Sequence, residues 1–361
     1  MLAIIPSILS DLQRGLNPNN RDFSVRNIDV AKSGSDLFDP FYQASYALHF
    51  NLGVQRQIAS DLVINADFVW RHFVHTPINN IDYNRYNSTQ GPVLPRCTAA
   101  AKNDPLAACS NGAIGFDNSA GLTRYKGLLV RVEKRFSRHV QFLGSYALSS
   151  NVGSNALRAS SAVSSGFNND NWFENYGPMN TDQRHVLNIS GFVELPRGFQ
   201  LSSSITYYSQ PPFAVFVGGM DFNGDGIQND LLPGTKENQF NRGLGKDDLT
   251  RLVEQFNRQF AGKPTAGGQI APQLTLPASY SFDHNFFTQD LGVNRTFLLK
   301  TERARMVLIG EVFNLFNYAN LTGYSGNVAN TAIFGQPSAR YDQVAGSGGP
   351  RTFQLAMRLS F

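Results

Sequence analysis

The sequence predicts an all-β fold, a transmembrane antiparallel up-and-down β-barrel of which this chain forms a part with about nine or ten strands. Three observations support this prediction. Short segments alternate between apolar and polar residues, as strands do when one face meets lipid and the other meets water. Only 16% of the 361 residues are charged, whereas soluble domains carry roughly 25%. Finally, short and long connections alternate between the segments.

The last eleven residues, 351–361, show the strand pattern most clearly. Side chains alternate between the two faces of a strand, so five apolar residues share one face: Phe353, Leu355, Met357, Leu359 and Phe361. About ten tilted residues of this kind are enough to cross a bilayer. A strand of a soluble β-sandwich has the same alternation, so this segment alone does not distinguish the two folds.

The order of connections favours the barrel over the sandwich. Nine segments read as strands: 42–54, 61–71, 124–136, 140–148, 184–193, 199–208, 285–298, 304–315 and 351–361. Tight turns alternate with long loops near 72–122, 149–181, 209–283 and 316–350. This alternation is typical of a barrel with short periplasmic turns at one rim and long extracellular loops at the other. Within the third loop, one short amphipathic helix is predicted by the helical spacing of five apolar residues: Leu249, Leu252, Val253, Phe256 and Phe260.

Residues 1–41 contain mostly turn-forming sequence, with a candidate strand at 23–30, and residues 42–361 form the barrel portion. The opening residues lack the charged start and cleavage site of a secretory signal. Bacterial single-chain barrels have even strand numbers, and nine is odd. We therefore expect an upstream part of the barrel to be absent from this sequence.

Composition excludes several other classes. No apolar run approaches the roughly 18 residues of a membrane-spanning helix. The net charge of +4 is spread along the chain without a basic block, so no nucleic-acid partner is expected. The six histidines are scattered, and Asp182, Arg184 and His185 read as a polar rim at the start of a strand. Glu311 is expected to face the lumen because a carboxylate in lipid is costly. The sequence therefore predicts no enzymatic activity.

Both cysteines, Cys97 and Cys109, fall in the first long loop. Two cysteines close together in one loop indicate a local disulfide in an oxidising compartment, since no further zinc ligands accompany them.

One polar cluster has the spacing of a calcium-binding turn. Asp221, Asn223 and Asp225 alternate and are followed by Gly226, so that three side-chain oxygens could surround the ion. The Ile227 carbonyl and Asn229 or Asp230 would complete the set. The bidentate Glu that usually closes such a loop is absent, because Leu232 occupies its position. An ordinary polar surface turn is the alternative interpretation.

Several segments resemble the C-terminal barrel half of TonB-dependent outer-membrane receptors. They are YKGLLVRVEKRFSRHVQFLGSYALSSN, TDQRHVLNISGFVELPRGFQLSSSITYYS, DFNGDGIQND, EVFNLFNYANLTG and RTFQLAMRLSF. The chain is most similar to the Oar-like group, whose full-length members carry an N-terminal carboxypeptidase-regulatory-like domain. The resemblance implies a place in the outer membrane and recognition of the terminal Phe by the barrel assembly machinery. It also implies contact with TonB through a plug domain, which is not identifiable in this chain.

The resemblance implies that the chain serves to bind or import an extracellular ligand, which the sequence does not name. A structural or adhesive outer-membrane surface protein is the alternative. A secreted soluble β-protein is a third interpretation, and it predicts partition into buffer without detergent.

Overall fold

The computed structural model describes residues 37–82, 84, 95–101, 109, 115–154, 168, 171, 175–298, 304–341 and 348–361. The candidate strand at 23–30 lies outside these residues. The described elements are β1 (Leu37–Phe38), β2 (Tyr46–Ala59), β3 (Leu62–Asp82), β4 (Gly115–Ser137), β5 (Val140–Ser154), β6 (Tyr176–Pro178), β7 (His185–Leu195), η3 (Pro196–Gly198), β8 (Phe199–Tyr208), α3 (Lys246–Gln259), β9 (Phe286–Leu298), β10 (Arg305–Phe313), β11 (Leu321–Thr322), β12 (Ala339–Arg340) and β13 (Thr352–Ser360). In the described part of the chain, no helix is long and apolar enough to span a membrane.

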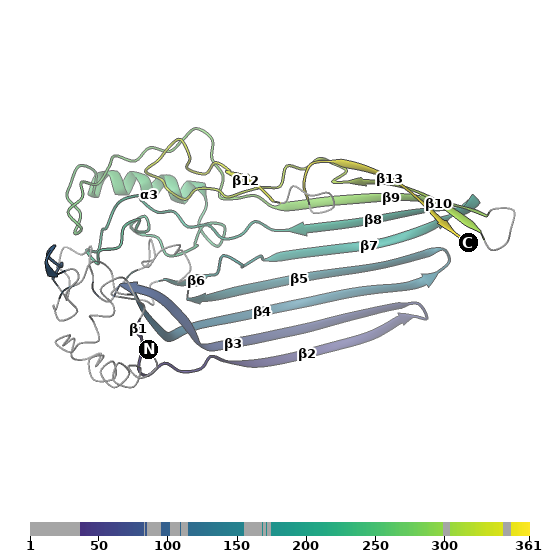
Figure 1. The fold of residues 1–361 in the computed structure, drawn as a ribbon, viewed down its shortest axis with the longest axis horizontal. Helices are drawn as coiled ribbons and strands as arrows, with labels where there is room; N and C mark the ends of the chain where they lie inside the picture. Colours follow the sequence, from purple (N-terminus) through teal and green to yellow (C-terminus); the bar gives the residue numbers. More distant parts are fainter. Residues whose placement is uncertain are drawn as a thin grey trace.

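One large sheet organises the structure, with its main strands in the order β13-β10-β9-β8-β7-β5-β4-β3-β2. Every pair along this path is antiparallel. Figure 1 shows the short turns and the C-terminus at one end of the sheet, while α3 and the long connections lie at the other. The main strands thus have the predicted antiparallel up-and-down order. The sheet is open in the structure, with β2 and β13 as its edge strands.

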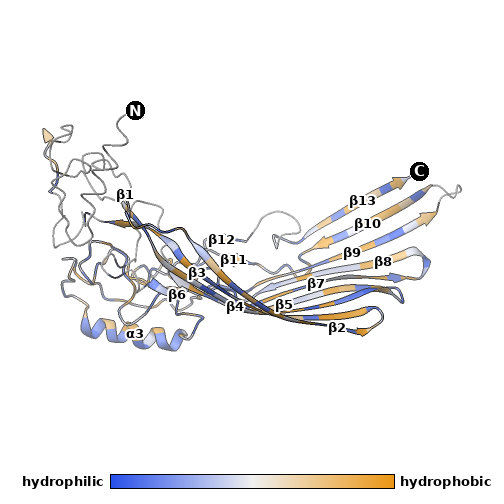
Figure 2. Cartoon of the chain, turned by 90° about the horizontal axis from the view of Figure 1, so that it is seen from below, coloured by the Kyte–Doolittle hydropathy of each residue, from blue (hydrophilic) through white to orange (hydrophobic). Residues whose placement is uncertain are grey.

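The register places the apolar side chains of neighbouring strands on one face. One cross-strand row contains Leu355, Gly310, Val293, Leu201, Val193 and Val140. The adjacent row, on the opposite face, contains Gln354, Glu311, Gly292, Ser202, Phe192 and Gln141. Figure 2 shows the same alternation of hydrophobic and hydrophilic residues along the strands. The apolar row that contains Leu355 is the face expected to meet lipid, and Glu311 lies on the opposite, inner face.

Two strands extend into the segment expected to be the first long loop, 72–122. β3 continues to Asp82 and β4 begins at Gly115. Their pairing shifts register between Val74 and Thr76, and twice more before Ile81. Each such irregularity reverses the side-chain alternation, so the period-two pattern that identified the other strands is broken here. The second loop, 149–181, is likewise shorter because β5 continues to Ser154 and pairs with β6.

The third and fourth long loops are folded together rather than structureless. Their buried side chains form one hydrophobic core: Phe213, Val215, Val217, Leu232, Phe240, Leu249, Val253, Phe256, Ala271, Leu274, Phe282, Val328 and Phe334. Backbone hydrogen bonds join the loops, including Phe216 N–H to Gly326 C=O at 2.9 Å. The predicted amphipathic helix is confirmed as α3, which buries Leu249, Val253 and Phe256. We call residues 209–283 and 316–341 the loop lobe.

Candidate functional site

The acidic turn of the loop lobe, residues 221–230, brings three carboxylates together. Asp221, Asp225 and Asp230 each offer an oxygen atom, and these atoms lie within 4.8 Å of one another. Asp221 and Asp225 are each 1% exposed and Asp230 is 9% exposed. Sequence spacing identified all three residues, and the structure turns their carboxylates toward a common centre.

The other residues of the predicted calcium set have different partners. The Asn223 side-chain oxygen accepts a hydrogen bond from Asp225 N–H at 2.9 Å, and the Asn229 oxygen accepts one from Gly219 N–H at 2.7 Å. Ile227 packs its side chain in the interior, where it is 2% exposed. Asn223 and Asn229 therefore hold the backbone of the turn, and the three aspartates supply its converging oxygens.

Backbone amides of the turn hydrogen-bond to the same carboxylates. Asp221 accepts from Gly224 N–H at 2.6 Å and from Gly226 N–H at 3.0 Å. Asp230 accepts from Phe222 N–H at 2.6 Å. Gly226 has φ of 90°, a left-handed conformation that residues with a Cβ rarely adopt. The chain can therefore fold back tightly enough to bring the amides to the carboxylates.

Burial raises the pKa of Asp230 to about 7, and the neighbouring charges of Asp225 and Asp221 add to this effect. Three buried carboxylates repel one another, so a proton or a cation at their centre lowers the energy of the folded turn. A cavity of about 580 Å³ lies beside the turn and is lined in part by Phe222, Asn223, Asp230 and Lys236. Of the three aspartates, Asp230 is the one that lines this cavity.

A second cavity, of about 460 Å³, lies where the strands enter the loop lobe, and we call it the junction cavity. Gln183 precedes β7, Pro211 follows β8 and Asp283 precedes β9, and all three line it. Tyr324 and Tyr341, from the fourth long loop, complete the wall. Burial raises the pKa of Asp283. Sequence reasoning did not identify this site, because its residues come from segments far apart in the chain.

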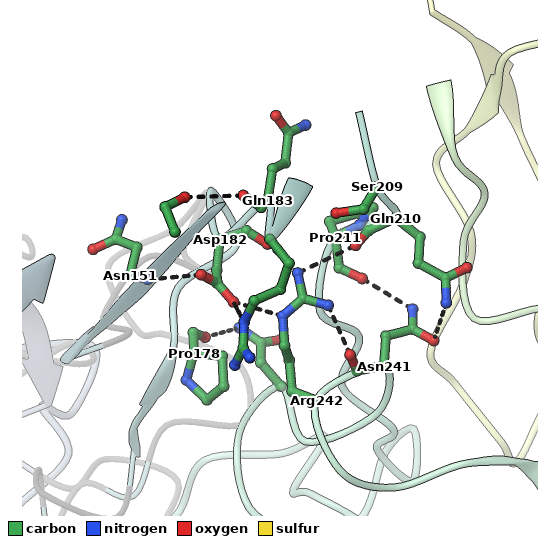
Figure 3. A network of polar contacts seen from close by, with 12 residues as sticks. Asn151, Pro178, Asp182, Gln183, Ser209, Gln210, Pro211, Asn241 and Arg242 are labelled. Atoms are coloured by element: carbon green, nitrogen blue, oxygen red, sulfur yellow. Dashed lines mark hydrogen bonds and ion pairs between the residues drawn. The ribbon is translucent and has the colours of Figure 1, made fainter. Parts of the chain in front are cut away.

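A buried ion pair fixes the loop lobe to the strand ends (Figure 3). Arg242 Nε donates to Asp182 Oδ2 at 2.5 Å, and the two side chains are only 3% and 1% exposed. Asp182 also accepts from Asn151 N–H at 2.6 Å, and Arg242 donates to the carbonyls of Asn241 and Gln210. Asp182, expected to be part of a polar rim, is therefore buried, whereas Arg184 and His185 are exposed.

The inner face of the sheet has a hollow of about 500 Å³ across β5, β7, β8, β9 and β10. Small residues such as Ser202 and Gly292 leave this space, and Asp290 and Glu311 place two carboxylates in its wall. Glu311, which the sequence assigned to the lumen, lies on this inner face.

The remaining residues singled out from the sequence lie away from the loop lobe core. The structure pairs Cys97 with Cys109, with the two Sγ atoms 2.05 Å apart. The five apolar residues of the terminal strand, Phe353 to Phe361, are all exposed on the edge strand β13 or directly after it. Neither group lines the two cavities of the loop lobe.

Comparison with known proteins places the chain among membrane barrels. The profile of a family described as "Outer membrane beta barrel domain" matches residues 7–354. No curated protein matches the sequence significantly.

Several solved structures are similar to this chain at low identity. The ferric-catecholate import receptor Fiu of Escherichia coli K12 is 12% identical with a TM-score of 0.42, over 88% of this chain and 28% of that one. The outer membrane transporter YddB of Escherichia coli is 12% identical with a TM-score of 0.45, over 92% and 36%. The ferric enterobactin receptor PfeA of Pseudomonas aeruginosa, in a mutant form, is 12% identical with a TM-score of 0.43, over 88% and 31%. The chain thus spans about a third of the length of these solved proteins.

Proposed function

Because this chain belongs to the outer membrane β-barrel domain family, we propose that it forms the C-terminal barrel portion of a TonB-dependent receptor that binds or imports an extracellular ligand. The resemblance to this receptor class covers nearly the whole chain, from about residue 40 onward. The resemblance further assigns the chain to the Oar-like group with a carboxypeptidase-regulatory-like N-terminal domain. TonB would act on it through a plug domain.

The observation that carries this proposal is the asymmetry between the two ends of the sheet. One end has only short turns, whereas the other bears the loop lobe with its own hydrophobic core and two cavities of about 460 and 580 Å³. Binding sites for small molecules are concave and of this size, and they are held on rigid scaffolds. A barrel that served only as a membrane anchor would not need a packed lobe with cavities.

In this proposal the loop lobe is extracellular and the short turns are periplasmic, as in outer-membrane barrels generally. The outward row that contains Leu355 and Val293 contacts lipid. The terminal residues Phe353, Leu355, Met357, Leu359 and Phe361 form the signal that the barrel assembly machinery reads.

Transport is tested by comparing what cells remove from their medium. The native strain, a strain lacking this gene and a strain lacking TonB function are grown in the same complex medium, and the spent media are compared by mass spectrometry. We expect at least one compound to be depleted by the native strain and to remain with both mutants. A compound that the gene-deletion strain depletes but the TonB-deficient strain does not is imported by another receptor, and it serves as the internal control.

The alternative function, a structural or adhesive surface protein, gives a different result. The deletion strain would then deplete the same compounds as the native strain, and its attachment to surfaces or to other cells would be reduced. That outcome would contradict transport and support the structural or adhesive function.

We further propose that the acidic turn binds calcium weakly through Asp221, Asp225 and Asp230, with the Ile227 carbonyl and the side chains of Asn223 and Asn229 adjusting around the ion. The proximity of the three carboxylate oxygens, within 4.8 Å, supports this proposal. We also propose that the Cys97–Cys109 disulfide is present in the protein in the oxidising envelope.

A further inference from the structure

We propose that the junction cavity binds an organic cation, an amine or amidinium group carried by a small molecule, with Asp283 as its counter-ion. This inference gives a chemical class to the ligand of the proposed receptor and in that sense rests on the proposed function. It can nevertheless be tested by binding alone, independently of transport. The argument depends on the charge, hydrogen bonding and aromatic lining of the cavity.

Asp283 is the single charged side chain among the described residues that line the cavity. The other polar groups there are neutral amides and hydroxyls, such as those of Asn180, Gln183 and Thr322. An anionic ligand would meet a like charge without a cationic partner in this wall. A cation, in contrast, would meet the one formal charge that the described residues of this wall carry.

The Asp283 carboxylate has unused hydrogen-bonding capacity. Among the described residues it accepts a single hydrogen bond, from His284 N–H at 2.7 Å, and none of the ion pairs there includes it. The Oδ2 atom and the remaining lone pairs of Oδ1 are therefore available to a ligand. Because a partly buried carboxylate without a counter-ion is costly, a donor group bound there would recover free energy. An amidinium fits this role well, since it can give two parallel N–H hydrogen bonds to one carboxylate.

Aromatic residues surround the same space. Phe213, Phe216, Tyr324 and Tyr341 line the cavity together with Asp283. The negative faces of aromatic rings attract cations, and aromatic walls also stack against the flat body of an organic ligand. A hard metal ion fits less well, since the described wall offers one carboxylate beside neutral oxygens, whereas calcium sites usually combine several carboxylates. The combination of one carboxylate and four rings favours an organic cation.

Side-chain hydrogen bonds hold the walls of the junction cavity in place. Asn241 donates its side-chain amide to the Pro211 carbonyl at 2.9 Å, and Asn238 donates to the Pro178 carbonyl at 2.8 Å. Ser281 Oγ donates to the Asp283 carbonyl at 2.9 Å and fixes the backbone that carries the acid. Asp283 has φ of 78°, a conformation that Asp and Asn adopt more readily than most residues. Asp283→Asn therefore changes the charge with little strain.

The test uses three flat probes of similar shape and different charge: benzamidine, benzamide and benzoate. Their affinities for the receptor, purified from the outer membrane in detergent, are measured by ligand-observed NMR. We expect benzamidine to bind about ten-fold more tightly than benzamide, and benzoate to bind least. In Asp283→Asn, the preference for benzamidine over benzamide should fall to within about two-fold.

Asp247→Asn is the matched control, because Asp247 is an exposed acid on α3 that does not line the cavity. It should keep the full preference for benzamidine. The proposal is overturned if benzamidine shows no binding, if benzamide binds equally well, or if Asp283→Asn retains the preference. A negative result in this binding assay would contradict the cation site and not the transport proposal. A negative result in the transport experiment would contradict transport and not the cation site.

Discussion

Arg242 and Asp182 form a buried ion pair between the loop lobe and the start of β7, although they are 60 residues apart in the chain. Asp182 accepts a further hydrogen bond from Asn151 N–H, next to the end of β5. Arg242 also donates to Gln210 C=O, just after β8. One arginine thus links the loop lobe to the ends of three neighbouring strands (Figure 3).

Replacing this arginine should release the loop lobe from the sheet. In Arg242→Ala the buried Asp182 carboxylate loses its buried partner and keeps only the more exposed Arg184, at 3.5 Å. Removing one partner of a buried pair costs about 3 to 5 kcal/mol, and Arg184 reduces this cost toward the lower end. We expect faster hydrogen exchange and protease cleavage in residues 209–283, with the transmembrane strands unchanged.

The pair formed by Arg251 and Asp248 on α3 provides the comparison. Arg251 is 71% exposed, so Arg251→Ala should cost no more than about 0.5 kcal/mol. Equal loosening of the loop lobe in the two variants would show that burial of the Arg242 pair is not what holds it.

The terminal strand tests the orientation of the sheet. Leu355 pairs with Gly310 on the lipid-facing row, whereas Gln354 pairs with Glu311 on the inner face. Leu355→Arg should therefore cost about 2 to 4 kcal/mol near the middle of the membrane, and Gln354→Arg far less. Equilibrium unfolding of the receptor in lipid measures both values, and equal costs would contradict the assigned faces.

Removing Phe361 should affect assembly more than stability. The residue is fully exposed at the end of the chain, beyond β13, so few contacts are lost with it. If the assembly machinery reads this aromatic, the shortened protein should reach the cell surface at a clearly lower level. Purified and folded, it should unfold under the same conditions as the wild type. Unchanged surface levels would argue against its role as a signal.

Much of the sheet could be predicted from the sequence because the alternation of apolar and polar residues within each strand indicates which side chains face outward. In the segments ending at Arg71, Leu148 and Phe361, every second residue is apolar, and a strand at a lipid surface needs only this local pattern. The pattern fails where β3 and β4 shift register beyond Val74, since each irregularity changes which residues face outward.

The loop lobe could not be predicted in the same way, because its core is formed by contacts between distant segments. Phe240 packs with Phe282, and Val328 joins the same core from the fourth long loop. Only α3 has a periodic pattern, and it was the one element predicted there. The acidic turn was found because its oxygens lie within ten residues, while the junction cavity depends on residues from Asn180 to Tyr341.

We expect the Cys97–Cys109 disulfide to stabilise its own loop without supporting the barrel. Closing a loop of this size, with a sequence separation of 12, contributes about 3 kcal/mol at most. The double variant Cys97→Ser with Cys109→Ser should therefore show faster protease cleavage near residue 100 and unchanged unfolding of the sheet. Two free thiols in mass spectra of protein purified from the envelope would refute the disulfide.

The acidic turn should couple calcium binding to pH. The pKa of Asp230 is about 7 in the folded turn, against an ordinary value of 3.8. A carboxyl group with a raised folded pKa contributes its full stability below about pH 4, and this contribution is lost as the pH rises through about 7. Without calcium, the turn should therefore become more sensitive to protease between pH 5 and pH 8. Calcium replaces the proton, so its protective effect should increase over the same interval.

Two substitutions distinguish the effect of the proton on protease resistance from the effect of calcium. Asp230→Asn removes the titrating charge, so the calcium-free turn should resist protease at pH 8 as well as it does at pH 5, and it should gain nothing from calcium. Asp225→Ala should abolish calcium-dependent protection, because it removes one of the three converging oxygens.

Since no bidentate Glu closes the loop, we expect half-maximal protection of the wild type at about 10⁻⁴ to 10⁻³ M calcium. Limited proteolysis of residues 209–283, at both pH values with EGTA or millimolar calcium, measures each effect, with Asp247→Asn on α3 as the control. If millimolar calcium does not protect the wild type at pH 8, the turn is an ordinary polar turn held by its own backbone hydrogen bonds.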